Sequence, residues 1–188
     1  MSSQGSPRPG TPLVHVLPLG PVEDRLLRIV AANLFSVYGW RARIESGLAV
    51  AASTLDNRRR QHDAANLLQQ LEAYGQRFPR HKTLAVTAVD LFVPIFQYVF
   101  GEARQGGAAA LVSVYRLAGA TAEIRYERAV KVALHEFGHL LSLTHCPDAR
   151  CLMHYAETAA GVDRIPLRFC RYCRAELRTL GPPGRQAR

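Results

Sequence analysis

The chain contains 188 residues with a mass of 20.8 kDa, a length that suits one domain with a hydrophobic core, or two at most. Apolar residues make up 48% and charged residues 21%, which is typical of a globular protein. The longest apolar runs fall well short of the roughly 18 residues that predict a membrane span, so we expect no membrane partner.

The two ends of the chain and its charge give broader expectations. Residues 1–12 are rich in Ser, Gly and Pro and lack the basic start and apolar core of a secretory signal, so we expect a disordered arm and a cytoplasmic protein. The net charge of +9 comes mainly from arginine, with one run at 58–60 and a second concentration from residue 164 onward. Nucleic acid is one interpretation, but the basic residues lack interleaved aromatics, so a solvated basic surface is favoured.

In chain order, apolar and β-branched residues first predict a strand at 11–19. Acidic residues at 23 and 24 then open a predicted helix that ends at Gly39. Residues 40–47 predict a second strand. The helix has an apolar stripe at helical spacing, formed by Leu26, Val30, Leu34 and Val37.

A second helix is predicted from Asp56 to Tyr74, and Gly75 ends it. Its apolar stripe comprises Ala64, Leu67, Leu68 and Leu71. The run at 82–93 is typical of a strand buried on both faces of a parallel sheet, and residues 97–107 and 108–117 predict two more strands joined by a Gly-rich turn. This β-α-β-α-β order predicts an α/β fold with crossover helices packed on a sheet.

A long helix is predicted from Ala122 to about Leu141, and it carries the sequence HEFGH. Side chains four residues apart lie on one helix face, so the imidazoles of His135 and His139 can bind one ion. Glu136 lies about 100° around the helix, within reach of a water on that ion. This arrangement is typical of zinc hydrolases, in which the metal lowers the pKa of water to about 7 and a carboxylate takes the proton.

His145 follows His139 by six residues and supplies a third imidazole. Three neutral imidazoles leave one zinc position open, which indicates a catalytic site. The pattern H-E-x-x-H-x-x-S-x-x-H resembles the metzincin metalloprotease motif, which has glycine where this chain has Ser142. Glycine suits that point because the helix must end sharply at a residue with positive φ, and another residue costs about 1–2 kcal/mol there.

All four cysteines lie in the last quarter of the chain, as C-x4-C followed by C-x-x-C. Disulfides and free thiols are alternatives, but a chain without an export signal lies among reduced thiols. Two pairs with no cysteine left over favour a closed four-thiolate zinc site. We therefore expect two zinc ions, a catalytic one on the three histidines and a structural one on Cys146, Cys151, Cys170 and Cys173.

The sequence HEFGHLLSLTHCPDARCLM, followed by CRYC, resembles the archaemetzincins over residues 135–173, although the interval between the cysteine pairs is about one residue short. The resemblance implies a metzincin-like, twisted mixed sheet and a small cytosolic zinc peptidase. It also implies an antiparallel edge strand that pairs with an extended peptide, for which residues 97–103 are the candidate. Met153 matches the family's Met-turn residue beneath the histidines, and core filling explains it equally well.

The residues after Met153 are similar to the Met-turn of the astacin branch, where a tyrosine can reach the metal or hydrogen-bond the oxyanion. This similarity makes Tyr155 a candidate for that role. His154 is interpreted as a residue behind the ligands or at the surface, and not as a fourth ligand. The three remaining histidines receive no predicted role: His15, His62 and His81.

Four segments are expected: the arm at 1–12, an α/β subdomain at 13–145 that ends in the active-site helix, a zinc-stapled C-terminal subdomain at 146–180, and a flexible tail at 181–188. The favoured function is hydrolysis of peptides or proteins by a monomeric zinc peptidase, with Glu136 as general base.

Two other functions are weighed against the peptidase. Bacterial endoribonucleases of ribosomal RNA maturation share the spacing His-x3-His-x5-His, but they lack the glutamate after the first histidine and the four cysteines. A non-catalytic zinc protein that binds a partner is the second alternative, and Ser142 is the residue that favours it. The sequence leaves open whether the peptidase trims N-termini or cuts internally.

Overall fold

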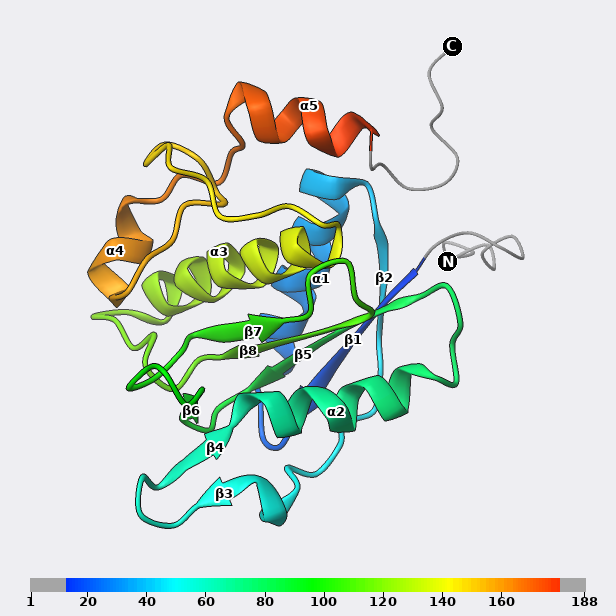
Figure 1. Cartoon of the computed structure of the whole chain (residues 1–188), viewed down its shortest axis with the longest axis vertical. Coiled ribbons are helices and arrows are strands. Elements are labelled where there is room, and N and C mark those ends of the chain that lie inside the picture. Colours follow the sequence, from blue (N-terminus) through cyan, green and yellow to red (C-terminus); the bar gives the residue numbers. More distant parts are fainter. Residues whose placement is uncertain (1–12, 180–188) are drawn as a thin grey trace.

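The computed structural model describes residues 13–179, which fold around a five-stranded mixed sheet (Figure 1). The strand order is β2-β1-β5-β8-β7. β1 (Leu13–Leu19), β2 (Arg41–Ile44), β5 (Lys82–Thr87) and β8 (Ala109–Ser113) run parallel, and β7 (Gly101–Ala103) lies antiparallel to β8 at the edge. The predicted α/β class and the antiparallel edge strand are therefore confirmed.

Helices cover both faces of this sheet (Figure 1). α1 (Asp24–Tyr38) and α3 (Ala122–Leu140) pack on one face, and α2 (Ala64–Gly75) packs on the other. Side chains of β8 alternate between the two layers, because successive residues of a strand point to opposite faces. Ala110 and Val112 join the core under α3, whereas Ala109 and Leu111 join the core under α2.

α1 follows its predicted pattern. Leu26, Val30 and Leu34 are buried against the sheet, and Val37 packs at the edge of the same core. Gly39 ends the helix with φ of 72°, and its N–H donates to the carbonyl of Phe35 at 2.8 Å. A left-handed residue at this position favours glycine, which has no Cβ.

The predicted helix from Asp56 to Tyr74 is wrong over its first eight residues. These form a hairpin of β3 (Leu55–Asp56) and β4 (Gln61–Asp63), which joins β6 (Leu91–Phe92) in a small three-stranded sheet. The Asp56 side chain accepts the backbone N–H groups of residues 58 and 59, which makes a turn. Asp63 caps α2 by accepting the N–H groups of residues 65 and 66 at 2.9 and 3.2 Å. Capping by an aspartate favours a helix start over a helix interior.

Three further differences concern strands and the C-terminal part. The run at 82–93 divides into β5 and β6, and only three residues of 97–107 form a strand. Regular signals fade after His145 in the sequence, yet two helices follow, α4 (Ala159–Arg164) and α5 (Arg171–Thr179). Elsewhere, a short 3-10 helix, η1 (Ala52–Thr54), precedes β3. Within residues 13–179, no helix is long and apolar enough to cross a membrane. The predicted arm at 1–12, the tail at 181–188 and residue 180 lie outside the described residues.

Candidate metal centres

α3 places HEFGH at its C-terminal end, beside the edge of the sheet. Thr121 caps the helix by accepting the N–H of Ile124 at 3.4 Å. An apolar face of the helix, which includes Ala133 and Phe137, is fully buried against the sheet and α1. The Tyr38 hydroxyl donates to the carbonyl of Leu134 at 2.6 Å and fastens the helix to α1 at the level of the motif.

The three predicted histidine ligands converge at one point, and we call them the histidine cluster. One ring nitrogen from each of His135, His139 and His145 lies within 4.8 Å of the others. Nδ1 of His135 contacts the carbonyl oxygen of Leu152 at 2.9 Å, and Nδ1 of His139 contacts that of Leu143 at 2.7 Å. Because a carbonyl oxygen only accepts, both Nδ1 atoms carry the proton and both Nε2 atoms present a lone pair.

The two Nε2 lone pairs face each other with 3.1 Å between His135 Nε2 and His139 Nε2. Two acceptors at this distance repel unless a cation lies between them. Zinc bonds of about 2.0–2.1 Å at a tetrahedral angle would separate two such nitrogens by about 3.3 Å. The donor set therefore fits a zinc ion.

Electrostatics keep these imidazoles neutral. Burial, followed by the neighbouring His139, lowers the pKa of His135 to about 3. Burial also lowers the pKa of His139 and of His145. Neutral imidazole is the form that binds metal, so the cluster is ready for an ion at neutral pH.

Ser142 adopts the left-handed conformation that the sequence comparison anticipated for this position, with φ of 68°. Its N–H donates to the carbonyl of His139 at 2.9 Å, and the N–H of Leu143 donates to that of Gly138 at 3.0 Å. Gly106, in the turn between β7 and β8, also donates its N–H to the His139 carbonyl, at 2.8 Å. The chain therefore turns sharply at Ser142 and brings His145 back to the end of α3.

Glu136 lies beside the histidine cluster with only 9% of its surface exposed. Burial, followed by the charge of Glu102, raises the pKa of its carboxyl well above the usual range. Gly101 of β7 makes room for this side chain, because a Cβ at that position would lie 2.8 Å from Oε1 of Glu136. The edge strand therefore contacts the candidate general base directly.

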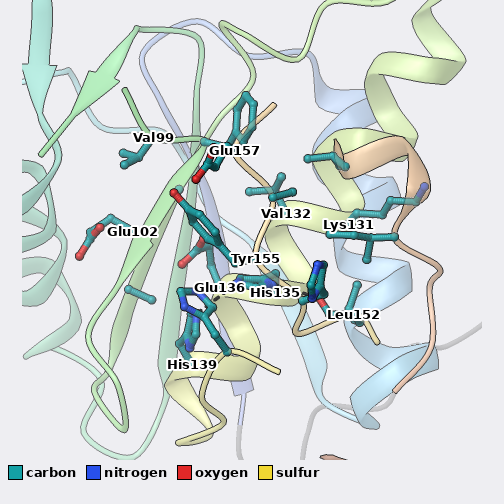
Figure 2. Close-up of a pocket in the computed structure, with 18 of the residues that line it drawn as sticks. Val99, Glu102, Lys131, Val132, His135, Glu136, His139, Leu152, Tyr155 and Glu157 are labelled. Carbon is teal, nitrogen blue, oxygen red and sulfur yellow. Dashed lines mark hydrogen bonds between the residues drawn. The ribbon is translucent and has the colours of Figure 1, made fainter. Parts of the chain in front are cut away.

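A cleft of about 520 Å³ opens above the histidine cluster, between α3, β7 and the segment at 152–157. Figure 2 shows Tyr155 lying over His135, Glu136 and His139. The ring centroids of Tyr155 and His145 are 5.2 Å apart. Tyr155 thus lines the cleft beside the third histidine. Nδ1 of His154 contacts the carbonyl oxygen of Cys146 at 3.0 Å, which agrees with a position behind the ligands.

Met153 is fully buried beneath the histidine-bearing helix. A Cβ on Gly138 would lie 2.5 Å from the Met153 sulfur and 3.1 Å from the Tyr38 hydroxyl. Gly138 therefore lets the thioether approach the backbone of the HEFGH turn. This contact supports both interpretations of Met153, because the same side chain fills the core and underlies the site.

The four predicted thiol ligands also converge, and we call them the cysteine cluster: Cys146, Cys151, Cys170 and Cys173. Their sulfurs lie within 4.8 Å of one another, and all four cysteines are free. The sulfurs of Cys146 and Cys170 are 3.7 Å apart, far beyond the disulfide bond length of about 2.05 Å. Four sulfurs around one point fit a tetrahedral zinc site with no open position.

The thiols have different surroundings. The backbone N–H of Cys173, at the start of α5, lowers the pKa of Cys170 to about 7. Burial raises the pKa of Cys146 and, more strongly, that of Cys173. A cation would therefore be needed to hold Cys146 and Cys173 as thiolates at neutral pH.

Two histidines without a predicted role form a polar cluster on the α2 face of the sheet. Nδ1 of His15 contacts Glu45 Oε1 at 2.7 Å, and its Nε2 contacts Nδ1 of His81 at 2.7 Å. His15 is buried and stacks on Phe78. The three residues are far apart in the chain, so no local pattern pointed to them. His62 contacts the Thr54 hydroxyl at 2.7 Å.

Comparison with known proteins shows to which family this chain, with its histidine cluster and its cysteine cluster, belongs. The sequence profile of Peptidase family M54 matches residues 24–179. An archaemetzincin of Archaeoglobus fulgidus is 34% identical over 165 residues, covering 88% of this chain and 98% of the relative. The chain belongs to the archaemetzincin family.

Solved archaemetzincin structures have the same fold as this protein. The structure from Methanopyrus kandleri superposes with a TM-score of 0.82 at 30% identity, covering 93% of this chain and 97% of that one. The structure of the Archaeoglobus fulgidus protein gives 0.79 at 34% identity, covering 87% and 99%. A zinc-dependent peptidase from Methanocorpusculum labreanum gives 0.80 at 28% identity, covering 87% and 99%.

Membership makes this chain a zinc-dependent metallopeptidase that acts on peptides. The family resemblance in residues 135–173 is therefore confirmed, and the endoribonuclease and non-catalytic alternatives lose their support.

Proposed function

We propose that this archaemetzincin hydrolyses peptide bonds at the histidine cluster, with Glu136 as the general base. The observation that carries the proposal is the pair of facing Nε2 lone pairs on His135 and His139 beside a buried carboxylate. Zinc held by three imidazoles would polarise the scissile carbonyl and bring the pKa of water to about 7.

The residues of the chain would divide the remaining work. Glu136 accepts the proton of the attacking water on a carboxylate oxygen and then delivers it to the leaving amine nitrogen. Its low exposure keeps bulk water away from this transfer, and Gly101 keeps the edge strand close to it. An extended peptide would add to β7, whose outer edge has no strand partner among residues 13–179. Tyr155 would donate a hydrogen bond from its hydroxyl to the oxyanion.

The cysteine cluster would hold a second zinc ion that closes the C-terminal subdomain at 146–180. Two zinc ions per chain, a monomeric state and cytoplasmic localisation are parts of the same proposal. Four free thiols support the localisation, since a four-thiolate site requires reduced cysteines.

The test is Glu136→Gln, with Glu123→Gln as the matched control in the exposed first turn of α3. Loss of a general base reduces kcat by about 10²–10⁴-fold. We expect this loss for Glu136→Gln, with two zinc ions per chain by mass spectrometry, and wild-type rates for Glu123→Gln. Retained turnover in Glu136→Gln would remove the glutamate from its role.

Two other outcomes would contradict the proposed peptidase function as a whole. Two zinc ions with no cleavage of a broad peptide library by the wild-type protein would favour the non-catalytic zinc-binding protein. Metal-dependent RNA cleavage with a salt-dependent gel shift would instead reopen the endoribonuclease.

A further inference from the structure

Exposed apolar side chains gather at the mouth of the cleft. Phe96 is 43% exposed and Tyr155 is 41% exposed, and Ile95, which precedes Phe96 in the chain, is 84% exposed. Phe96 and Tyr155 both line the cleft, with their ring centroids 6.4 Å apart. Since the Tyr155 and His145 centroids are 5.2 Å apart, a row of rings runs from Phe96 to the third histidine. Such a row offers a continuous apolar surface to whatever enters the cleft.

The segment that carries Ile95 and Phe96, residues 93–98, is here called the rim loop. It is tied across the cleft mouth, because the Tyr98 hydroxyl donates to the carbonyl of Glu157 at 2.8 Å. The Arg116 guanidinium lies 4.3 Å from the centroid of the Tyr98 ring and bonds Asp90 at 2.7 and 2.6 Å. These contacts fix the position of the Tyr98 ring.

The hairpin of β3 and β4 braces the same C-terminal half of the rim loop. One guanidinium nitrogen of Arg59 donates to the carbonyls of Phe96 at 2.8 Å and Gln97 at 3.3 Å. The same guanidinium covers the ring of Phe92 at 4.3 Å, and Gln61 also donates to the Gln97 carbonyl, at 3.0 Å. The hairpin therefore bonds the carbonyls of Phe96 and Gln97, while the Phe96 side chain stays partly exposed.

This arrangement explains one member of the arginine run at 58–60. Within residues 13–179, Arg59 contacts the rim loop, whereas the Arg58 side chain has no polar contact. A partly exposed Phe96 ring on a loop that is fastened at residues 96–98 is preorganised, so binding a side chain there costs little ordering entropy. Apolar surface at the mouth of a binding cleft marks a contact with a ligand.

We propose that Phe96 and Tyr155, next to the exposed Ile95, form a subsite that selects peptides with a bulky apolar side chain near the scissile bond, and that Arg59 is its positioning residue. This inference rests on the proposed peptidase function. The occupant is an aliphatic or aromatic side chain of the substrate, since the surface that the rim loop offers is apolar and adjoins the histidine cluster.

The first experiment profiles cleavage of a decapeptide library by the zinc-loaded protein, with mass spectrometry of the products. We expect bulky apolar residues to be enriched at one position near the cleavage point. The preference is the ratio of kcat/KM for the best peptide to kcat/KM for the same peptide with alanine at the enriched position. In the variant Ile95→Ser/Phe96→Ser this ratio should fall about 10–100-fold, mainly because KM for the best peptide rises. Phe35→Ser, at a residue of α1 that is 57% exposed, is the control. No enrichment, or an unchanged preference in the double variant, overturns the subsite.

The second experiment compares Arg59→Gln with Arg58→Gln, which changes the same charge in the same turn. Arg59→Gln should raise KM several-fold for the bulky peptide, leave kcat unchanged, and leave the alanine peptide unaffected. Arg58→Gln should match the wild-type protein. A merely structural role would lower the melting temperature without separating the two peptides. Equal KM values in both variants would remove Arg59 from the positioning role.

A binding measurement separates this inference from the proposed function. The zinc-loaded Glu136→Gln protein is used to select peptides from the same library, and the bound peptides are identified by mass spectrometry. Apolar enrichment that disappears in Ile95→Ser/Phe96→Ser supports the subsite even if the wild-type protein cleaves nothing. Cleavage without apolar enrichment in the bound pool supports the peptidase and contradicts the subsite.

Discussion

The histidine cluster and the cysteine cluster are built in opposite ways. Two of the three imidazoles come from one helix, and carbonyl hydrogen bonds already orient their rings. The cysteine cluster takes its ligands from two segments, 146–151 and 170–173, outside the sheet and the three longer helices. Cys151 and Cys173 are buried, whereas His145 is exposed.

The difference shows where each part of the fold gets its stability. The sheet core and the carbonyl hydrogen bonds orient the histidines, so we expect an ion there to add chemistry more than structure. Cys151, Cys173 and the neighbouring Phe169 join the main core, but four free thiols that lie this close together gain little from packing alone. We infer that the C-terminal subdomain depends on its ion for folding, as small zinc modules do.

The largest expected effect follows from Cys151→Ser. Losing a buried ligand of the proposed structural zinc should cost at least about 4 kcal/mol of unfolding free energy, which corresponds to a fall in Tm of about 8–16 °C. Calorimetry and a zinc count would show the fall together with the loss of one ion. A variant with two ions and a wild-type Tm would contradict the closed four-thiolate site.

His145→Ala applies the same test to the histidine cluster. The variant should lose one zinc ion and at least about 1000-fold in kcat/KM, since zinc stabilises transition-state charge by several kcal/mol. Its Tm should fall much less than that of Cys151→Ser, because the sheet and α3 hold the rest of the cluster. An equal fall in Tm would show that both clusters support the fold alike.

Gly138→Ala tests the contact that links the two regions. The new methyl group would press on the Met153 sulfur. In the chain, Met153 lies between Cys151 of the cysteine cluster and Tyr155, which lines the cleft. Overpacking of this kind costs about 1–3 kcal/mol. We expect a lower midpoint in urea denaturation and slower hydrolysis together. Loss of stability without loss of activity would show that Met153 only fills the core and does not support the histidine cluster.

The smallest effect is expected for Ser142→Gly. Glycine relieves the left-handed strain at φ of 68° but loses more entropy on folding, so a net gain of about 0.5–1 kcal/mol is expected. Ser142→Ala is the control, since it keeps the strain and removes only the hydroxyl. If Ser142→Gly is no more stable than Ser142→Ala in urea denaturation, the serine at this turn is unstrained.

Local patterns predicted the elements that carry the site. The helix from Ala122 to Leu140 and the apolar stripes of α1 and α2 follow from helical periodicity. The hairpin at 55–63 was missed because the turn at Asp56 and the cap at Asp63 look like ordinary polar helix positions in sequence. The contact of Arg59 with the rim loop joins residues 37 positions apart, beyond any local pattern.

The sequence by itself determined the donor types and their spacing: three imidazoles and a carboxylate around one helix end, and four thiols in two pairs. Those features are local, because helix geometry and chain connectivity set which side chains can meet. Only the tertiary structure decided that Gly101 leaves space for Glu136, that Phe96 meets Tyr155 at the cleft mouth, and that β7 is an edge. Packing between distant segments creates these contacts, and no spacing along the chain encodes them.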